Sequence, residues 1–279
     1  MTPQGFAVLA EVLRGASGLA IGPDKLYLLQ TRLEPLLRAH ALPDLDALAC
    51  RLGRGGDRAL AGEMVQAMTT NETSFFRDRR PFAHVRDHAL ARLHAARPAG
   101  VRLRLWSAAA SSGQEAYSLA MLVDQSRTRL AGRGVDILAT DIAAAPLARA
   151  EAGLYTQFEV QRGLPAPMLQ QYFRQQGGLW RIAGVLRDMV AFRQWNLLAD
   201  LRPLGRFDLV FCRNVLLYFD PPTRALVLAA MAQQMAPDAL LYLGGAESLL
   251  GVTDMFTELA GHRGVYALAP AAVACHATA

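Results

Sequence analysis

The fold is decided by residues 103–113, which read L-R-L-W-S-A-A-A-S-S-G. The first four residues predict a short apolar strand, and Ser107 to Gly113 form a loop of small side chains that leads into a helix containing Tyr117. Small residues let a ligand approach the backbone, and a helix N-terminus offers free N–H groups. The stretch predicts a nucleotide-binding strand–loop–helix unit, although such a loop can also be only a tight connection.

Further strands alternate with helices after this unit. We expect strands at residues 137–141, 207–212 and 239–243, with helices starting near Pro146 and Pro222. Short apolar strands that alternate with helices imply a parallel sheet covered on both faces. In an open sheet of this kind, ligands bind outside the carboxyl ends of the strands, where the small-residue loop is expected.

The chain is expected to have two domains. Residues 1–95 are predicted to be helical, because apolar residues recur there at the period of one helix face. We assign them to an N-terminal helical domain and linker, and residues 96–279 to the α/β domain. Residues 155–200 fit the alternation less well, since 180–182 and 189–195 look like strands with turn-rich flanks. They predict a small antiparallel insertion.

Composition limits the class of protein. The chain has 279 residues, of which 52% are hydrophobic and 19% charged, as in a folded globular protein. It has no apolar run long enough for a membrane span, and its first residues lack the basic region of a signal peptide. Cys50, Cys212 and Cys275 are far apart, form neither a disulfide framework nor a metal signature, and fit a reducing cytosol. We therefore expect a cytoplasmic protein without membrane insertion.

The charge pattern leaves two interpretations open. The net charge is +5, and nearly all the basic residues are arginine, since Lys25 is the sole lysine. Genome composition alone can produce this pattern, or it can reflect attraction to an acidic partner. No run of Lys and Arg is dense enough to predict a nucleic-acid site. His84 and His88 stand one helical turn apart, but such a pair is commonly a surface feature, so no metal is expected.

Three positions at predicted strand ends are candidate ligand contacts. Asp141 can accept both hydroxyl hydrogens of a ribose, or it can cap the next helix. Arg213 and Asn214 follow a strand directly, where they can contact a ligand or orient the loop through hydrogen bonds. Tyr218, shortly after them, is either a packing residue or points its hydroxyl into the cleft.

Five segments of the chain stand out together. They are N-E-T-S-F-F-R-D (71–78), L-W-S-A-A-A-S-S-G-Q-E-A-Y-S (105–118), L-A-T-D-I (138–142), F-D-L-V-F-C-R-N-V-L-L-Y-F-D (207–220) and G-G-A-E-S-L-L-G (244–251). In sequence, order and spacing they resemble the CheR family, the chemotaxis protein-glutamate O-methyltransferases. The first and fourth segments are the most specific, and the resemblance covers nearly the whole chain.

The resemblance implies a fold and a cofactor. The fold is a Rossmann-like methyltransferase domain with an N-terminal all-helical domain and a small antiparallel β-subdomain at about 155–200. The cofactor is S-adenosylmethionine, with S-adenosylhomocysteine as product. By resemblance the site is composed of Asn71, Thr73 and Arg77 at the methionine end, Glu115 beside the small-residue loop, Asp141 on the ribose, Asn196, Leu197, Arg213 and Asn214 flanking the rest, and Tyr218 near the transferring methyl.

The resemblance also implies a substrate. The acceptors would be glutamate side chains on the cytoplasmic helical domain of methyl-accepting chemoreceptors. Some family members also bind a pentapeptide tether at the receptor C-terminus, and the short segment at 172–181 predicts that this chain does not need it. Docking would instead use the basic N-terminal domain, through Lys25, Arg32 and Arg38.

The chain departs from the family at four positions. Gln114 and Ala116 stand in a segment that usually reads G-E-E-P-Y, and Gly245 and Ala246 replace the usual His-Ser of the last segment. The second change removes two polar side chains near the sheet end. Two alternatives stay open: the same fold acting on another acceptor, such as a small molecule or RNA, or a non-catalytic cofactor-binding signalling protein.

Overall fold

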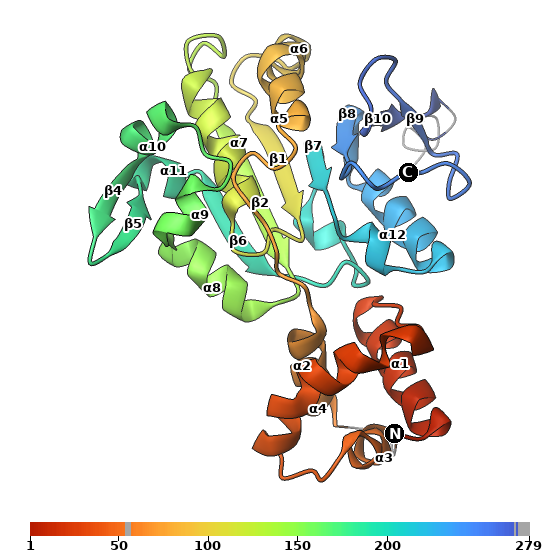
Figure 1. Ribbon diagram of the computed structural model, residues 1–279. Helices are drawn as coiled ribbons and strands as arrows, with labels where there is room; N and C mark the ends of the chain where they lie inside the picture. The colour runs from red at the N-terminus through yellow and green to blue at the C-terminus, as the bar shows by residue number, and fades with distance from the viewer. Residues whose placement is uncertain (54–56, 271, 273–279) are drawn as a thin grey trace. The chain divides into compact units, whose positions relative to one another are not determined.

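The computed structural model describes residues 1–53, 57–270 and 272, and these form two compact units. The helical unit comprises Met1–Thr70 and Leu217–Arg224, and the sheet unit comprises Asn71–Leu216 and Ala225–Ala279 (Figure 1). The first segment of the helical unit thus ends at Thr70, and the helices at 80–96 belong to the sheet unit. Cys275 lies outside the described residues.

The helical unit is built from amphipathic helices. They are α1 (Pro3–Ser17), η1 (Pro23–Lys25), α2 (Leu26–Ala39), α3 (Leu45–Gly53) and α4 (Arg58–Met68). On α2, Leu29, Leu33 and Leu36 are buried, as their spacing predicted. Helix α4 starts at Asp57, whose side chain accepts a hydrogen bond from the Leu60 N–H at 3.0 Å and so satisfies one free donor of the first turn.

A seven-stranded sheet organises the other unit. Its order is β6-β2-β1-β7-β8-β10-β9. The strands are β1 (Leu103–Ala108), β2 (Val135–Asp141), β6 (Val190–Gln194), β7 (Phe207–Cys212), β8 (Met235–Tyr242), β9 (Phe256–Glu258) and β10 (Val265–Leu268). The five strands from β6 to β8 are parallel, and β10 and β9 are antiparallel additions. The four strands expected from the sequence are therefore confirmed.

Helices connect and cover the strands. They are α5 (Arg80–His84), η2 (Val85–Ala89), α6 (Leu90–Ala96), α7 (Gln114–Gln125), α8 (Ala144–Ala152), α9 (Gln157–Gln161), α10 (Ala166–Tyr172), α11 (Gly184–Arg187), η3 (Arg202–Leu204), η4 (Leu216–Tyr218) and α12 (Pro221–Gln233). Helix α7 packs on β1, β2 and β6, and ten of its twelve residues are buried. Such burial requires a helix that is apolar nearly all round, which A-Y-S-L-A-M-L-V supplies.

The small antiparallel insertion exists, but its strands differ in part from those expected. It is a three-stranded sheet of order β3-β5-β4, made of β3 (Leu154–Tyr155), β4 (Phe173–Gln176) and β5 (Leu179–Ile182). Figure 1 shows β4 and β5 as a hairpin that extends from the rest of the sheet unit. The expectation that 189–195 joins this insertion is wrong, because β6 pairs in parallel with β2 from Val190↔Ile137 to Gln194↔Asp141.

Phe75 connects the insertion to the rest of the sheet unit. Its ring is fully buried and makes edge contacts with Tyr155 at 5.1 Å and Phe173 at 5.6 Å between centroids. These contacts fix the segment 71–78 against the insertion, because edge-to-face aromatic pairs add to the burial of their apolar area. In the residues that the structure describes, no helix combines the length and the apolar character needed to cross a membrane.

Candidate functional site

The carboxyl ends of β6, β2, β1, β7 and β8 lie along one edge of the sheet, which we call the carboxyl edge. Parallel pairing brings the loops after these strands together, and open α/β sheets bind ligands in this place. The residues predicted from the sequence follow four of the strands. Asn196 and Leu197 follow β6, Asp141 ends β2, the small-residue loop follows β1, and Arg213 and Asn214 follow β7.

The small-residue loop has an unusual backbone. Ala109, Ser111 and Gly113 have φ angles of 57°, 50° and 87°, all in the left-handed region. A left-handed conformation is strained for residues with a Cβ, and such strain clusters at functional sites. Gly113 is required by packing as well, since a Cβ there would lie 2.8 Å from the Cβ of Ala150. Alternating conformations of this kind turn backbone N–H groups toward a common side, where anions bind.

Asp141 connects two loops of the carboxyl edge. Its Oδ2 accepts the Ser111 N–H at 2.7 Å, and its Oδ1 accepts the Ala143 N–H at 2.8 Å. Burial raises the pKa of Asp141, and the N–H groups of Ala143 and Ser111 lower it. The N-cap position of α8 is Ala143, so Asp141 stands before the cap. Because a carboxylate has about four lone-pair sites, it can still accept ribose hydroxyls. The ribose contact stays a prediction.

Arg213 is the centre of a buried ionic network. Its Nη1 donates to Glu115 Oε2 at 3.0 Å, and its Nη2 donates to Asp78 Oδ2 at 2.5 Å and to the Arg77 carbonyl at 2.9 Å. Ser107 Oγ donates to the other oxygen of Glu115 at 2.8 Å. Burial raises the pKa of Glu115, whereas Arg213 and Ser107 lower it. The network favours the interpretation in which Arg213 orients the loops.

One hydrogen-bond donor of the Arg213 guanidinium is not used by this network. Its buried Nε–H has no hydrogen-bond partner in the part of the chain that the structure describes. A buried donor without an acceptor is costly, so a ligand that supplies the acceptor would be stabilised there.

The segment 71–78 lies against the same loops. The Phe76 N–H donates to Ser118 Oγ at 3.0 Å, and Ser111 Oγ donates to the Asn71 carbonyl at 2.8 Å. Asn71 is exposed, and Thr73 and Arg77 are half-buried. Arg77 Nη1 donates to the carbonyl of Glu72 at 3.1 Å. The structure thus brings this segment to the carboxyl edge together with Ser111 and Arg213.

The remaining predicted residues divide between the two units. The backbone N–H of Trp195, next to Asn196, donates to the Asp141 carbonyl at 2.9 Å, and Leu197 is buried. This hydrogen bond brings Asn196 and Leu197, which follow Trp195 directly, to the end of β2 where Asp141 stands. Tyr218 ends η4 in the segment Leu217–Arg224 of the helical unit, where its carbonyl accepts the Ala20 N–H at 2.9 Å. Its contact with the cofactor stays a prediction.

Sequence reasoning missed Glu247. Its carboxylate accepts backbone hydrogen bonds from Asn214, Val215 and Gly244 at 2.7, 3.0 and 2.7 Å. A signal was present, since an acidic residue stood just after a predicted strand in the last of the five matching segments. Glu247 can join the loops after β7 and β8 only because these two strands are neighbours in the sheet, which the sequence does not show.

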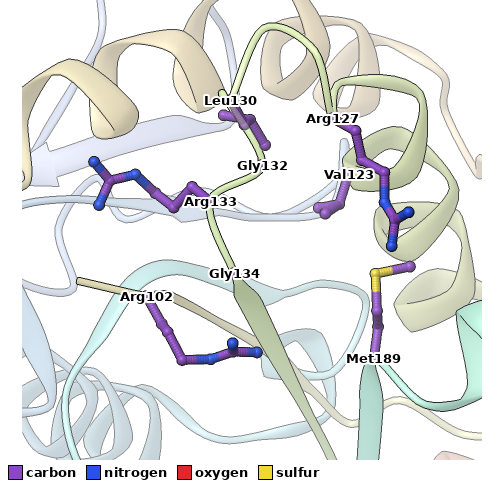
Figure 2. Close-up of a pocket in the computed structure, with 8 residues that line it drawn as sticks. All are labelled: Arg102, Val123, Arg127, Leu130, Gly132, Arg133, Gly134 and Met189. Atoms are coloured by element: carbon purple, nitrogen blue, oxygen red, sulfur yellow. The ribbon is translucent and has the colours of Figure 1, made fainter. Parts of the chain in front are cut away.

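A cavity of about 410 Å³ lies at the opposite edge, where the strands begin. Figure 2 shows Arg102, Arg127 and Arg133 around it, with Arg133 extending away from Met189. These arginines are already paired: Arg102 with Asp136 at 2.6 Å, Arg127 with a carboxylate at 3.3 Å, and Arg133 with backbone carbonyls. The cavity therefore offers no unsatisfied charge to a ligand.

His84, one of the two histidines singled out in the sequence, lies in a different environment from the one expected. His84 is buried, contrary to the surface position expected, and its Nδ1 lies 2.8 Å from the Tyr242 hydroxyl. Its ring lies 4.4 Å from that of His262 between centroids. Burial lowers the pKa of His84 to about 4. Within the described residues, no group of three or more His, Cys, Asp or Glu side chains is arranged to hold a metal ion.

The parallel sheet, the left-handed loop before α7 and the buried Asp141 define a Rossmann-like cofactor-binding protein. Residues 71–265 match the family described as CheR methyltransferase, SAM binding domain, and residues 4–69 match its all-alpha domain. The chain belongs to the CheR methyltransferase family. Its cofactor is S-adenosylmethionine, for which the residues fit: Asp141 offers acceptors, and the buried Arg213 Nε–H has no acceptor among the described residues.

Named relatives agree with this assignment. The chain is 39% identical over 257 residues to chemotaxis protein methyltransferase 1 of Pseudomonas aeruginosa, covering 90% of this chain and 92% of the relative. It is 38% identical over 269 residues to a chemotaxis protein methyltransferase of Vibrio anguillarum, covering 95% and 96%. A TehB-like SAM-dependent methyltransferase structure from Corynebacterium glutamicum is more distant, with 16% identity and a TM-score of 0.37 over 68% of this chain and 92% of that one.

Proposed function

We propose that this protein transfers the methyl group of S-adenosylmethionine to glutamate side chains on the cytoplasmic helical domain of methyl-accepting chemoreceptors. The observation that carries the proposal is the match of both family domains along the chain, together with relatives named chemotaxis protein methyltransferases. The reaction is then a protein-glutamate O-methylation in the cytoplasm. The first part of the chain, up to residue 70, acts as the receptor-docking domain, and residues 71–95 belong to the sheet unit that binds the cofactor.

Methylation of a carboxylate requires little acid–base catalysis by the protein. A glutamate carboxylate has a reference pKa of about 4.3, so it is ionised at neutral pH and needs no general base. Bound S-adenosylmethionine supplies a methyl group activated on a sulfonium. The protein's task is to hold the acceptor carboxylate and the cofactor in line. This explains why a nucleophile–base pair is not needed at the carboxyl edge.

The described contacts suggest how the chain divides this task. Arg77 is proposed to bind the carboxylate of the cofactor's methionine end, with Asn71 and Thr73 beside it. Asp141 is proposed to bind the ribose. The Glu115–Arg213 pair would keep the Arg77 backbone in place, since Arg213 donates to its carbonyl. Tyr218 is proposed as the catalytic residue next to the transferring methyl.

Docking is proposed to use the basic side chains of the helical unit. Lys25 and Arg38 are exposed, although Arg38 pairs with Glu34 at 3.0 Å. Arg32 is engaged differently, because its guanidinium donates to the Met68 carbonyl at 2.6 Å and to Thr70 Oγ1 at 3.1 Å. Arg32 therefore closes the end of α4, and attraction of acidic helix faces falls mainly to Lys25 and Arg38.

Tether binding is proposed to be dispensable. The β4–β5 hairpin turns through two residues, Gly177 and Gly178, with φ angles of 57° and 81°. This is the tightest common hairpin connection, and β4 has only four residues at the edge of the small sheet. A short edge gives a peptide few main-chain hydrogen bonds.

Methyl transfer to receptor-enriched membranes tests the proposal. Wild-type protein with radiolabelled S-adenosylmethionine should label the receptor, and mild alkali should release the label as methanol because methyl esters are base-labile. Receptors with their methylated glutamates replaced by alanine are the matched control and should stay unlabelled. Alkali-stable label, or equal label on the control receptors, would contradict a glutamate acceptor.

The tether proposal has its own test. Titration of the protein with a free tether pentapeptide should give no micromolar binding. Methylation of receptors that lack the tether should proceed and weaken as salt rises, because salt screens exposed charges. Micromolar peptide affinity would contradict this part of the proposal.

A further inference from the structure

A turn after β8 folds a carboxylate back onto the carboxyl edge. The Glu247 N–H donates to the Gly244 carbonyl at 2.9 Å, which closes a four-residue turn. Gly245 and Ala246 form the exposed corners, and a Cβ at Gly245 would meet nothing within 4 Å. These corners are the two positions that depart from the usual His-Ser of the family. The departure therefore leaves the turn itself and its carboxylate intact.

The Glu247 carboxylate joins two loops. Its Oε2 accepts the N–H groups of Asn214 and Gly244, each at 2.7 Å, and its Oε1 accepts the Val215 N–H at 3.0 Å. Hydrogen bonds to a charged acceptor are about twice as strong as neutral ones. One side chain thus fixes the loop after β7 to the loop after β8.

The loop that Glu247 holds is strained. Asn214 has a φ of 59°, a left-handed conformation that Asn tolerates better than most residues. The successive N–H groups of Asn214 and Val215 converge on one anion, as in the anion-binding nests formed by such backbone turns. Here the anion is internal. These two N–H groups are therefore already committed, and the Asn214 side chain is what remains for a ligand.

The turn formed by Gly244 and Glu247 also restricts the position of the Asn214 side chain. A Cβ on Gly244 would lie 2.6 Å from Asn214 Nδ2 and 2.8 Å from Glu247 Oε2. The amide of Asn214 thus packs directly on the Gly244 backbone, in space that only glycine leaves open. Backbone and side chain of Asn214 are both set by the Glu247–Gly244 turn.

We propose that Glu247 is a positioning residue of the cofactor site, which orients Asn214 for contact with S-adenosylmethionine. The proposal deepens the proposed function and rests on the cofactor contact predicted for Asn214. Glu247 acts through Asn214 and contributes to cofactor affinity without touching the cofactor.

A double-mutant cycle read by calorimetric binding of S-adenosylhomocysteine tests this role. Glu247→Gln keeps the shape but loses the charge, and should weaken binding about tenfold, the effect of losing a charged hydrogen-bond acceptor. In an Asn214→Ala background the same change should weaken binding less than about twofold, because the route through Asn214 is already lost. In an Asp141→Ala background the full effect of about tenfold should remain.

Two further variants keep the test informative. Glu247→Asp retains the charge on a shorter side chain and should recover part of the lost affinity. Asp136→Asn, at the other edge of the same sheet, should bind like wild type, and thermal unfolding should show each variant folded. Unchanged affinity in Glu247→Gln, or a full effect in the Asn214→Ala background, would overturn the proposal. The expected cycle without receptor methylation would support Glu247 and contradict only the proposed acceptor.

Discussion

The two edges of the parallel sheet carry similar charged side chains but pair them differently. At the carboxyl edge, Asp141 and Glu247 accept hydrogen bonds from backbone N–H groups of the loops. At the opposite edge, Asp136 pairs with Arg102, and Arg97 donates to two carboxylates. At the carboxyl edge, carboxylates thus hold loop backbones in addition to pairing with Arg213, whereas at the opposite edge Asp136, Asp208 and Asp238 pair with arginines.

This difference identifies the ligand edge better than cavity size does. The cavity of about 410 Å³ lies at the arginine-paired edge (Figure 2), where each charge already has a counter-charge or a carbonyl. The carboxyl edge instead holds backbone in strained, left-handed conformations, which fixed hydrogen bonds stabilise. Preorganised loops, rather than volume, mark the site.

The largest expected effect is at Arg213. Arg213→Met should lower the free energy of unfolding by about 3–5 kcal/mol, because Glu115 is left as an unpaired buried charge. Arg97→Met at the other edge should cost less, because its partner Asp238 is 36% exposed and its buried partner Asp208 still accepts the Arg104 N–H at 2.8 Å. Urea unfolding of both variants measures the difference. A greater loss in Arg97→Met would invert the comparison.

The same variant gives a pH dependence. Burial raises the pKa of Glu115, and Arg213 lowers it, so the folded-state pKa should rise further without Arg213. Between the unfolded value of about 4.3 and that raised value, the folded state binds more protons than the unfolded state, and stability falls as pH rises. The deficit of Arg213→Met should therefore be smallest near pH 4 and grow toward neutrality. Urea titrations across this range should reveal the trend, and a pH-independent deficit would speak against a buried Glu115 charge.

Arg77 tests the part of the carboxyl edge supplied by the segment 71–78. Arg77→Ala should lower kcat/KM by roughly 10- to 100-fold, the effect of a lost hydrogen bond to a charged group. Arg77→Lys should recover only part of it, because lysine lacks the planar fork that binds a carboxylate with two hydrogen bonds. Steady-state kinetics with S-adenosylmethionine measure both. Wild-type kinetics in Arg77→Ala would remove this residue from the site.

Asp141 and Asp136 stand at opposite ends of β2 and form a matched pair. Asp141→Ala should weaken S-adenosylmethionine binding by roughly 1–3 kcal/mol through lost hydrogen bonds to a charged group. Asp136→Ala should leave affinity unchanged, because its exposed carboxylate pairs with Arg102. Calorimetric titration of both variants with S-adenosylmethionine measures the two affinities. Equal affinities with intact folds would leave Asp141 a loop-fixing residue alone.

The smallest effect is expected for the exposed pair Arg102–Asp136. Its side chains are 57% and 51% exposed, so Arg102→Met should change the free energy of unfolding by no more than about 1 kcal/mol. Thermal unfolding at low and high salt is the measurement. A loss as large as that of Arg213→Met would mean that the two edges do not differ in the way described.

The sequence predicted those features of the fold that depend on residues close together in the chain. The strands β1, β2, β7 and β8 follow from short apolar runs, and the buried face of α2 follows from the helical spacing of its leucines. The partner of β6 could not be predicted, because strand pairing is set by distant residues, and Asn196 and Leu197 entered only through the family resemblance. Glu247 was missed for the same reason, since its role requires β7 and β8 to be neighbours. The burial of His84 depends on a loop that brings His262 from far along the chain.

The most direct test of the account is hydrogen–deuterium exchange with and without S-adenosylhomocysteine. Ligand should slow exchange in the segment 71–78, in the small-residue loop 107–113 and in 213–216, because these form the carboxyl edge. Exchange at 127–134 and 189, around the cavity of about 410 Å³ at the opposite edge, should not change. Protection confined to the cavity edge, with 107–113 and 213–216 unaffected, would contradict the central claim.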